Sequence, residues 1–134
     1  RLVGTAADKV AVVSFVVVFA ILVIVHELGH FLTAKGFRMP VEEFAVGFGK
    51  KVAVLLRRDG TEYTLRAVPA GGFVRIAGME IEQAGEGSPD DEERAPAPAD
   101  GFHQRPVYQR FLVILGGPLF SLALGYVAYV LLFL

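Results

Sequence analysis

The sequence predicts an integral membrane α-helical protein. Two transmembrane helices, at about residues 9–35 and 110–134, are expected to be connected by a small antiparallel β-sheet region (about 41–79) and a disordered acidic linker. Two observations carry this prediction. Apolar side chains make up 54% of the chain, and they are concentrated in two runs, residues 10–25 and 111–134, that contain no charged side chain. A long uncharged run is typical of a helix that crosses a bilayer.

The first run is long enough to span a membrane. With residues 28–34 continuing it, a helix of about 25 residues can cross roughly 30 Å of hydrocarbon. A signal peptide is the alternative, because Lys9 precedes the apolar stretch. No small-residue cleavage site follows, and the run continues into His26 instead. We therefore favour a transmembrane helix.

The run ends in the motif His26-Glu27-Leu28-Gly29-His30. Histidines four residues apart share one helix face, so both can hold one Zn²⁺ ion while Glu27 reaches an activated water. Glu27 is thus the candidate general base. The alternative is a pair of histidines that only form hydrogen bonds at the interface. Burying ionisable groups beside an apolar span is costly unless they are paired or bind metal, which favours the metal site.

A third zinc ligand is not evident. Catalytic zinc usually takes three protein ligands and one water, and the second apolar run contains no Asp, Glu or His. Glu42, Glu43 and His103 remain as candidates, and each is expected to be solvated. The third ligand is therefore expected in sequence that this chain does not contain. Such a fragment should bind zinc weakly and cleave nothing by itself.

The region after the first helix has strand character. We expect four short strands, at residues 41–48, 51–58, 61–68 and 73–79, with a turn at Asp59-Gly60. Glycines punctuate the region at 47/49 and 71/72. They either mark ordinary turns and bulges or let the backbone approach a substrate strand at membrane depth.

Residues 80–101 are acidic and rich in Pro, Ala and Gly, a composition that predicts a disordered linker. Residues 102–110 should lie at headgroup level before the second span. That span begins with Gly116, Gly117 and Pro118. The glycines indicate an ordinary helix-packing face, and Pro118 should bend the helix locally.

Composition excludes some functions and indicates an orientation. There is no cysteine, hence no disulfide framework and no cysteine metal site. A net charge of −1 without a basic stripe argues against a nucleic-acid partner. Eleven of the 13 Lys and Arg residues lie between positions 35 and 110. The positive-inside bias therefore predicts a cytoplasmic connecting region and an N-terminus outside.

These motifs together resemble the site-2 protease family of intramembrane zinc metalloproteases, particularly the branch of the regulator of sigma-E protease. The resemblance covers nearly all of residues 10–134 except the acidic linker. It rests on Val25-His-Glu-Leu-Gly-His-Phe, Val41-Glu-Glu-Phe-Ala-Val-Gly-Phe-Gly-Lys, Gly60-Thr-Glu-Tyr, Val68-Pro-Ala-Gly-Gly-Phe-Val-Arg and Leu115-Gly-Gly-Pro-Leu, in the family's order.

The resemblance implies that residues 1–134 are the N-terminal portion of such a protease in the inner (cytoplasmic) membrane. It implies Zn²⁺ as cofactor, bound by His26 and His30, with Glu27 as the catalytic acid/base. It implies that the β region presents a transmembrane substrate protein, such as an anti-sigma factor, as an added strand. The residues implied in substrate binding are Gly47, Phe48, Gly49, Gly71 and Gly72.

The chain departs from the family in two respects. The family commonly has Asn where this chain has Ser121. The later transmembrane segment with its Asp ligand, and the PDZ-type domains of many members, are missing from this sequence. Two other functions remain open: a membrane-anchored zinc protease acting on cytosolic substrates, and an inactive relative that only binds membrane proteins.

Overall fold

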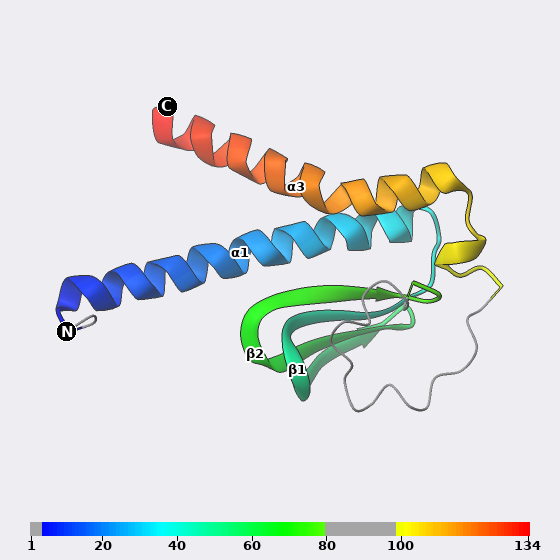
Figure 1. Cartoon of the computed structure of the whole chain (residues 1–134), viewed down its shortest axis with the longest axis horizontal. Coiled ribbons are helices and arrows are strands. Elements are labelled where there is room, and N and C mark those ends of the chain that lie inside the picture. The colour runs from blue at the N-terminus through cyan, green and yellow to red at the C-terminus, as the bar shows by residue number, and fades with distance from the viewer. Residues whose placement is uncertain (1–3, 80–98) are drawn as a thin grey trace.

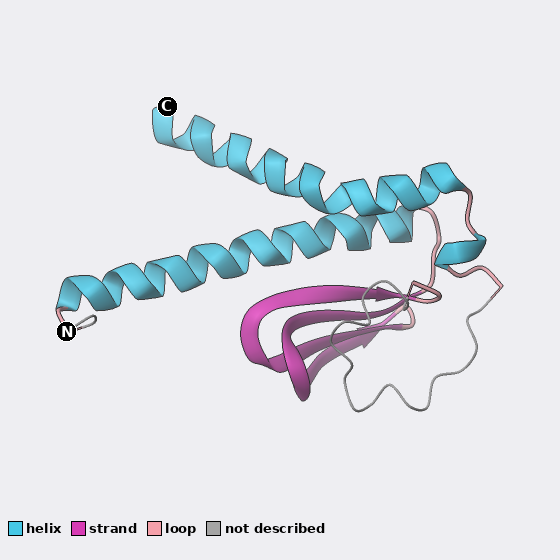
Figure 2. Cartoon of the chain, viewed as in Figure 1, coloured by secondary structure: helices cyan, strands magenta, loops and turns pink. Residues whose placement is uncertain are grey.

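The computed structural model describes residues 4–79 and 99–134. Its two long helices are α1 (Ala6–Gly36) and α3 (Val107–Phe133), and a short 3₁₀ turn, η3 (Phe102–Gln104), precedes α3. Between the helices in the chain lies one antiparallel pair of strands, β1 (Val41–Arg58) and β2 (Thr61–Ile76) (Figure 2). Most of the expected linker, residues 80–98, lies outside the described residues.

Both predicted spans are confirmed as long apolar helices, each starting three residues earlier than expected. Thr5 caps α1: its hydroxyl oxygen accepts a hydrogen bond from the amide of Asp8, and its own amide donates to the Asp8 carboxylate at 3.0 Å. Large apolar side chains along the first half of α1 are exposed, from Val10 to Ile24. Both helices are long and apolar enough to cross a membrane.

The helices cross near the C-terminal half of α1 and then separate. Figure 1 shows them side by side there, with α3 changing direction midway and diverging from α1 toward its own C-terminus. Pro118 lies inside α3, where it cannot donate a backbone hydrogen bond, and this accounts for the bend. The crossing is close because Gly29 faces Gly116: a Cβ on Gly29 would lie 2.7 Å from the Gly116 carbonyl carbon. The predicted glycine packing face is thus confirmed.

The sheet consists of two long bent strands, so the expectation of four separate strands was wrong. The bends coincide with the glycines that suggested breaks: Gly47 (φ 93°) and Gly49 (φ 78°) in β1, and Gly71 (φ 152°) in β2. Glycine adopts these left-handed values without strain, so the strands bend and continue instead of ending. The first half of β1 pairs with both ends of β2, and Val46 faces both Gly72 and Leu65.

A buried ion pair holds this folded-over hairpin together. The Glu43 carboxylate accepts hydrogen bonds from Arg66 at 2.7 Å and from the Thr64 hydroxyl, and Arg75 lies 3.1 Å away. Glu43 is 3% and Arg66 is 4% exposed. The expectation that Glu43 is solvated was therefore wrong. Its charge is matched by guanidinium groups from β2, which is the condition for burying a carboxylate.

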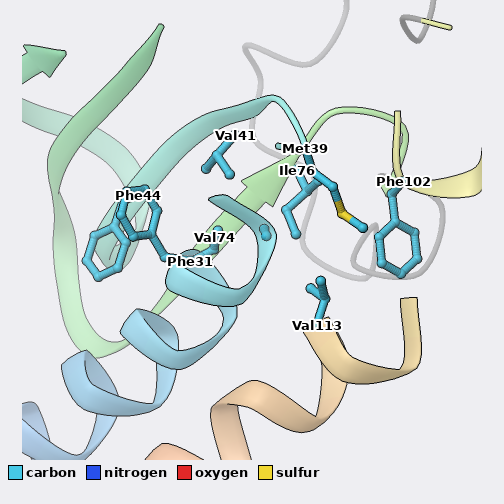
Figure 3. Close-up of a cluster of buried hydrophobic side chains, with 9 residues drawn as sticks. Phe31, Met39, Val41, Phe44, Val74, Ile76, Phe102 and Val113 are labelled. Carbon is cyan, nitrogen blue, oxygen red and sulfur yellow. The ribbon is translucent and has the colours of Figure 1, made fainter. Parts of the chain in front are cut away.

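The core lies where the C-terminal half of α1, the sheet and the start of α3 meet. Figure 3 shows Phe31 of α1, Phe44 of β1, Val74 of β2 and Val113 of α3 converging there. Arg105, which precedes α3, donates hydrogen bonds to the carbonyl oxygens of Phe37 and Arg38, just beyond the end of α1. These bonds tie the start of α3 to the end of α1. This packing fixes α3 and the sheet against the helix that carries the histidine motif.

Candidate metal centre

The two motif histidines converge on one point. Because His26 and His30 lie one turn apart on α1, their rings share a face, and their Nε2 atoms are 3.2 Å apart. Two nitrogens bound to one tetrahedral zinc ion at 2.0–2.1 Å would be about 3.3 Å apart. The imidazoles therefore already have the spacing that one zinc ion needs.

Helix α3 holds both rings from behind. His30 Nδ1 lies 2.8 Å from the carbonyl oxygen of Val113, and His26 Nδ1 lies 3.0 Å from the hydroxyl oxygen of Ser121. A carbonyl can only accept, so His30 carries a proton on Nδ1, and Nε2 is the ring nitrogen left to bind a metal ion. Such contacts behind the metal-facing nitrogen orient histidine ligands in metalloproteins.

A third residue of α3 leaves room for the rings. A Cβ on Gly117 would lie 2.7 Å from His26 Nε2 and 2.6 Å from His30 Cε1. Any larger residue at this position would therefore displace the histidines. Val113, Gly117 and Ser121 are spaced four residues apart and form one ridge of α3 against the histidine ridge of α1.

The carboxylate of Glu27 lies between the histidines and the sheet. It lines an open groove of about 320 Å³ together with Leu22, Val23, His26 and Ser121. On its other side it lines a cavity of about 30 Å³, roughly the volume of one water molecule, with His30, Val74 and Val113. The backbone amide of Val74 interacts with the same carboxylate. Glu27 thus connects the histidines to the edge of β2.

The site supplies two of the three protein ligands that catalytic zinc usually takes. Within residues 4–79 and 99–134, no group of three or more His, Cys, Asp or Glu residues could hold a metal ion. Of the three further candidates, Glu43 is engaged by Arg66, while Glu42 and His103 are exposed. None of them joins the histidine pair, so the residues fit zinc only as a partial ligand set.

The glycines predicted to bind substrate lie in the two bends of the sheet. One of them is close to the helix that carries the histidines. Gly72 is beside α1, where an added Cβ would lie 3.4 Å from the side chain of Val23. Phe48 stacks on Phe73 and also covers Gly71. Gly47 is buried and Gly49 is exposed. Their contribution to substrate binding stays a prediction.

Sequence reasoning missed the α3 side of the site. It treated Gly117 as ordinary packing and noted Ser121 only as a departure from the family's Asn. The spacing of Gly117 and Ser121 is a usable signal, since small residues four apart mark a face that another helix approaches. A backbone carbonyl such as that of Val113 leaves no mark in a sequence.

Similarity to known proteins extends over most of the chain. The family model for Peptidase family M50 matches residues 14–134. A Thermotoga maritima protein named "Putative zinc metalloprotease" is 40% identical over 118 residues, which are 88% of this chain and 22% of that protein. "Probable protease eep" of Enterococcus faecalis is 52% identical over 68 residues, 51% of this chain and 16% of that protein. The chain thus spans less than a third of the length of these relatives.

Proposed function

The chain belongs to peptidase family M50, a family of zinc metalloproteases, and we propose that it supplies two zinc ligands and the catalytic carboxylate of an intramembrane endopeptidase. The substrate is a protein whose transmembrane segment is cleaved. The observation that carries this proposal is the convergence of His26 and His30, with Nε2 atoms 3.2 Å apart and both Nδ1 atoms engaged by α3. The third ligand comes from outside the described residues, and without it the chain is inactive.

The roles of the residues follow from their positions. Zinc, when bound, supplies Lewis-acid chemistry that polarises a scissile carbonyl and activates water. Glu27 accepts the proton of the attacking water and returns it to the leaving amide nitrogen. Its place between the histidines and the edge of β2 puts the carboxylate next to both the metal site and a strand-like substrate. The core around Phe31 and Val113 keeps α1 and α3 in register during this transfer.

We place this chemistry inside the inner membrane, with the connecting region on the cytoplasmic side. Support comes from the two apolar helices and from the basic residues that flank them, such as Lys35 and Arg105. The groove beside Glu27 is lined by Leu22 and Val23, which lie within the apolar span of α1. The polar side chains that also line it, His26, Glu27 and Ser121, would admit water where lipid otherwise excludes it.

The substrate enters as an extended strand along the end of β2. Residues 72–76 pair with β1, and Glu27 lies beside them through its contact with the backbone of Val74. Strand addition to the edge of a sheet unwinds a substrate helix and exposes its carbonyl groups. The bends at Gly47-Phe48-Gly49 and Gly71-Gly72 shape this edge and bring it beside α1.

Replacement of Glu27 tests the proposal. In the full-length protein, Glu27→Gln should retain zinc and lose cleavage of a transmembrane substrate by at least about a hundredfold, as expected for a general base. His26→Ala and His30→Ala should lose zinc as well. Glu42→Gln, at an exposed position of β1, is the matched control. Normal processing by the Glu27→Gln protein would rule out the general base, and cleavage of soluble substrates alone would support an anchored cytosolic protease instead.

A further inference from the structure

The bend of β1 is held by one buried side chain of β2, that of Arg66. Its guanidinium Nη1 donates a hydrogen bond to the carbonyl oxygen of Gly49 at 2.7 Å. The backbone of Arg66 lies against the same bend, since a Cβ on Gly47 would be 2.9 Å from the Arg66 carbonyl oxygen. Both the side chain and the backbone of Arg66 therefore contact the bend formed by residues 47–49.

The same guanidinium reaches the bend of β2 through two aromatic rings. It lies over Phe73, 5.0 Å from the ring centroid, a placement in which the cation is attracted to the ring face. Phe73 stacks on Phe48, with centroids 6.4 Å apart and planes 13° apart. Phe48 in turn covers Gly71, where an added Cβ would be 2.7 Å from Phe48 Cζ. Arg66 thus connects the two bends of the sheet.

Glu43 sets the orientation of this guanidinium. Nε and Nη2 of Arg66 donate to the Glu43 carboxylate at 3.2 and 2.7 Å, and Nη1 is directed at Gly49. A planar guanidinium with two donors on one carboxylate has little freedom to rotate. The Thr64 hydroxyl and Arg75 also bind this carboxylate and restrain it. Glu43 therefore fixes the direction in which Nη1 points.

Charge balance alone does not account for this arrangement. Arg75 already places a cation 3.1 Å from the Glu43 carboxylate. Arg66 adds a hydrogen bond to a backbone carbonyl and a contact with an aromatic face, neither of which neutralises Glu43. These two contacts are the ones that join the buried ion pair to the bends.

We propose that Arg66 is a positioning residue for substrate binding: oriented by Glu43, it fixes the shape of the Gly47-Phe48-Gly49 bend and of the bend stacked against it. Arg66 is 4% exposed, so it acts through the bends and does not touch the substrate. The inference rests on the proposed function, since it takes the bends as part of the surface that binds a substrate strand. Arg66 contributes to substrate affinity and not to the chemical step at Glu27.

Two variants remove the fork of Arg66 without leaving Glu43 or Arg66 as an unpaired buried charge. Arg66→Lys keeps a cation beside Glu43 but replaces the planar fork with a single ammonium group. The double variant Glu43→Gln/Arg66→Met removes both charges, and replacing a buried ion pair by uncharged residues of similar volume often preserves stability. Its glutamine keeps an oxygen for the Thr64 hydroxyl. Chemical denaturation should show both variants folded.

Cleavage kinetics in the full-length protein test the proposal with a transmembrane substrate in detergent. In both variants KM should rise about tenfold, comparable to the loss of one hydrogen bond to a charged group, with kcat and zinc content unchanged. A higher KM at constant kcat indicates lost substrate binding. If Arg66 only balanced the charge of Glu43, Arg66→Lys would keep the normal KM, and that result would overturn the proposal. A fall in kcat at unchanged KM would also overturn it.

Hydrogen exchange of the same proteins, followed by mass spectrometry, reports on the bend without substrate. The amides of residues 47–50 should exchange at least about tenfold faster in both variants, while those of α1 exchange normally. Unchanged exchange at residues 47–50 would overturn the role of Arg66 in holding the bend. Arg57→Met is the matched control, because Arg57 is an exposed residue of β1 that pairs with Glu62 at 3.0 Å near the turn. It should leave both KM and exchange unchanged.

The unchanged full-length protein separates this inference from the proposed function. If it cleaves no transmembrane substrate, the proposed function is wrong, and the contribution of Arg66 to substrate affinity is wrong with it. If it cleaves such a substrate with the same KM as both Arg66 variants, the proposed function stands and only the role of Arg66 is wrong.

Discussion

A Cβ atom on Gly117 would lie 2.7 Å from Nε2 of His26, which is closer than any real side chain tolerates. The histidine pair of α1 therefore occupies the space that a side chain on α3 would fill. Further along the same helix, an added Cβ on Gly125 would have no tertiary neighbour within 4 Å among the residues that the structure describes. Two glycines of one helix thus differ in whether they face the histidine pair or open space.

This difference makes the first prediction. Gly117→Ala should weaken zinc binding at least about tenfold, or 1.4 kcal/mol, because the methyl group displaces both imidazoles. Gly125→Ala should bind zinc normally, and alanine favours a helix over glycine. Zinc titration of both variants, alongside thermal unfolding in detergent, checks this. Normal zinc affinity in Gly117→Ala would mean that α3 yields easily at the crossing.

The sequence predicted the elements better than their contacts. Both helices and the histidine motif follow from apolar runs and spacing, which are local properties. Glycine commonly interrupts a strand, so the sequence predicts separate strands on either side of Gly47-Phe48-Gly49 and of Gly71-Gly72. Here Gly47, Gly49 and Gly71 have a left-handed φ, so the chain bends and the same strand pairs again on the far side. That outcome depends on partners distant in the sequence.

The burial of Glu43 likewise depends on a partner that is distant in the sequence. Glu42 and Glu43 are adjacent and were both expected to face solvent, yet Glu42 is exposed and Glu43 is 3% exposed. Alternation along the strand indicates that one of them faces inward. Only the folded hairpin brings Arg66 to within 2.7 Å, which makes Glu43 the buried one.

The buried ion pair makes the second prediction. Glu43→Ala should destabilise the hairpin by roughly 3–5 kcal/mol, because it leaves the Arg66 guanidinium buried without its counter-charge. Glu42→Ala, one position away and exposed, should change stability by less than about 0.5 kcal/mol. Chemical denaturation followed by a hairpin-specific probe checks both. Similar losses in the two variants would indicate that the pair contributes little.

The third prediction concerns the pH dependence of the ion pairs that Glu62 forms near the turn between β1 and β2. A hydrogen bond and ion pair with Lys51, at 2.5 Å, and the nearby charge of Arg57 hold the pKa of Glu62 below its usual value of 4.5. Since the pKa is lowered in the folded state, the stabilisation is present above the unfolded pKa of 4.5. It is lost as pH falls through the folded pKa.

Titration of the Glu62 carboxyl signal by NMR checks this directly. The midpoint should lie below 4.5 in the unchanged chain and should rise toward that value in Lys51→Met. Because the group is near the surface, about 1 M salt should reduce the shift. A midpoint that does not respond to Lys51→Met would show that Lys51 is not the cause.

The fourth prediction separates backbone shape from substrate handling at Gly49. Gly49 has a φ of 78° and is exposed, and within the described part of the chain an added Cβ would have one tertiary neighbour within 4 Å, Val68 Cγ2 at 3.8 Å. Gly47 in the same bend has a φ of 93° and is packed against the carbonyl oxygens of Val68 and Arg66. Substitution at Gly49 is therefore limited by backbone conformation alone, whereas substitution at Gly47 also forces the two strands apart.

Gly49→Val should lower cleavage of a transmembrane substrate about tenfold in the full-length protein, because a β-branched residue disfavours positive φ and flattens the bend. Gly49→Asn tolerates that conformation and should retain most activity. Both variants should keep normal zinc content, since the histidines lie on α1. Measuring cleavage and zinc content together distinguishes impaired substrate handling from loss of zinc. Equal cleavage by the Val and Asn variants would make Gly49 an ordinary turn residue with no part in presenting the substrate.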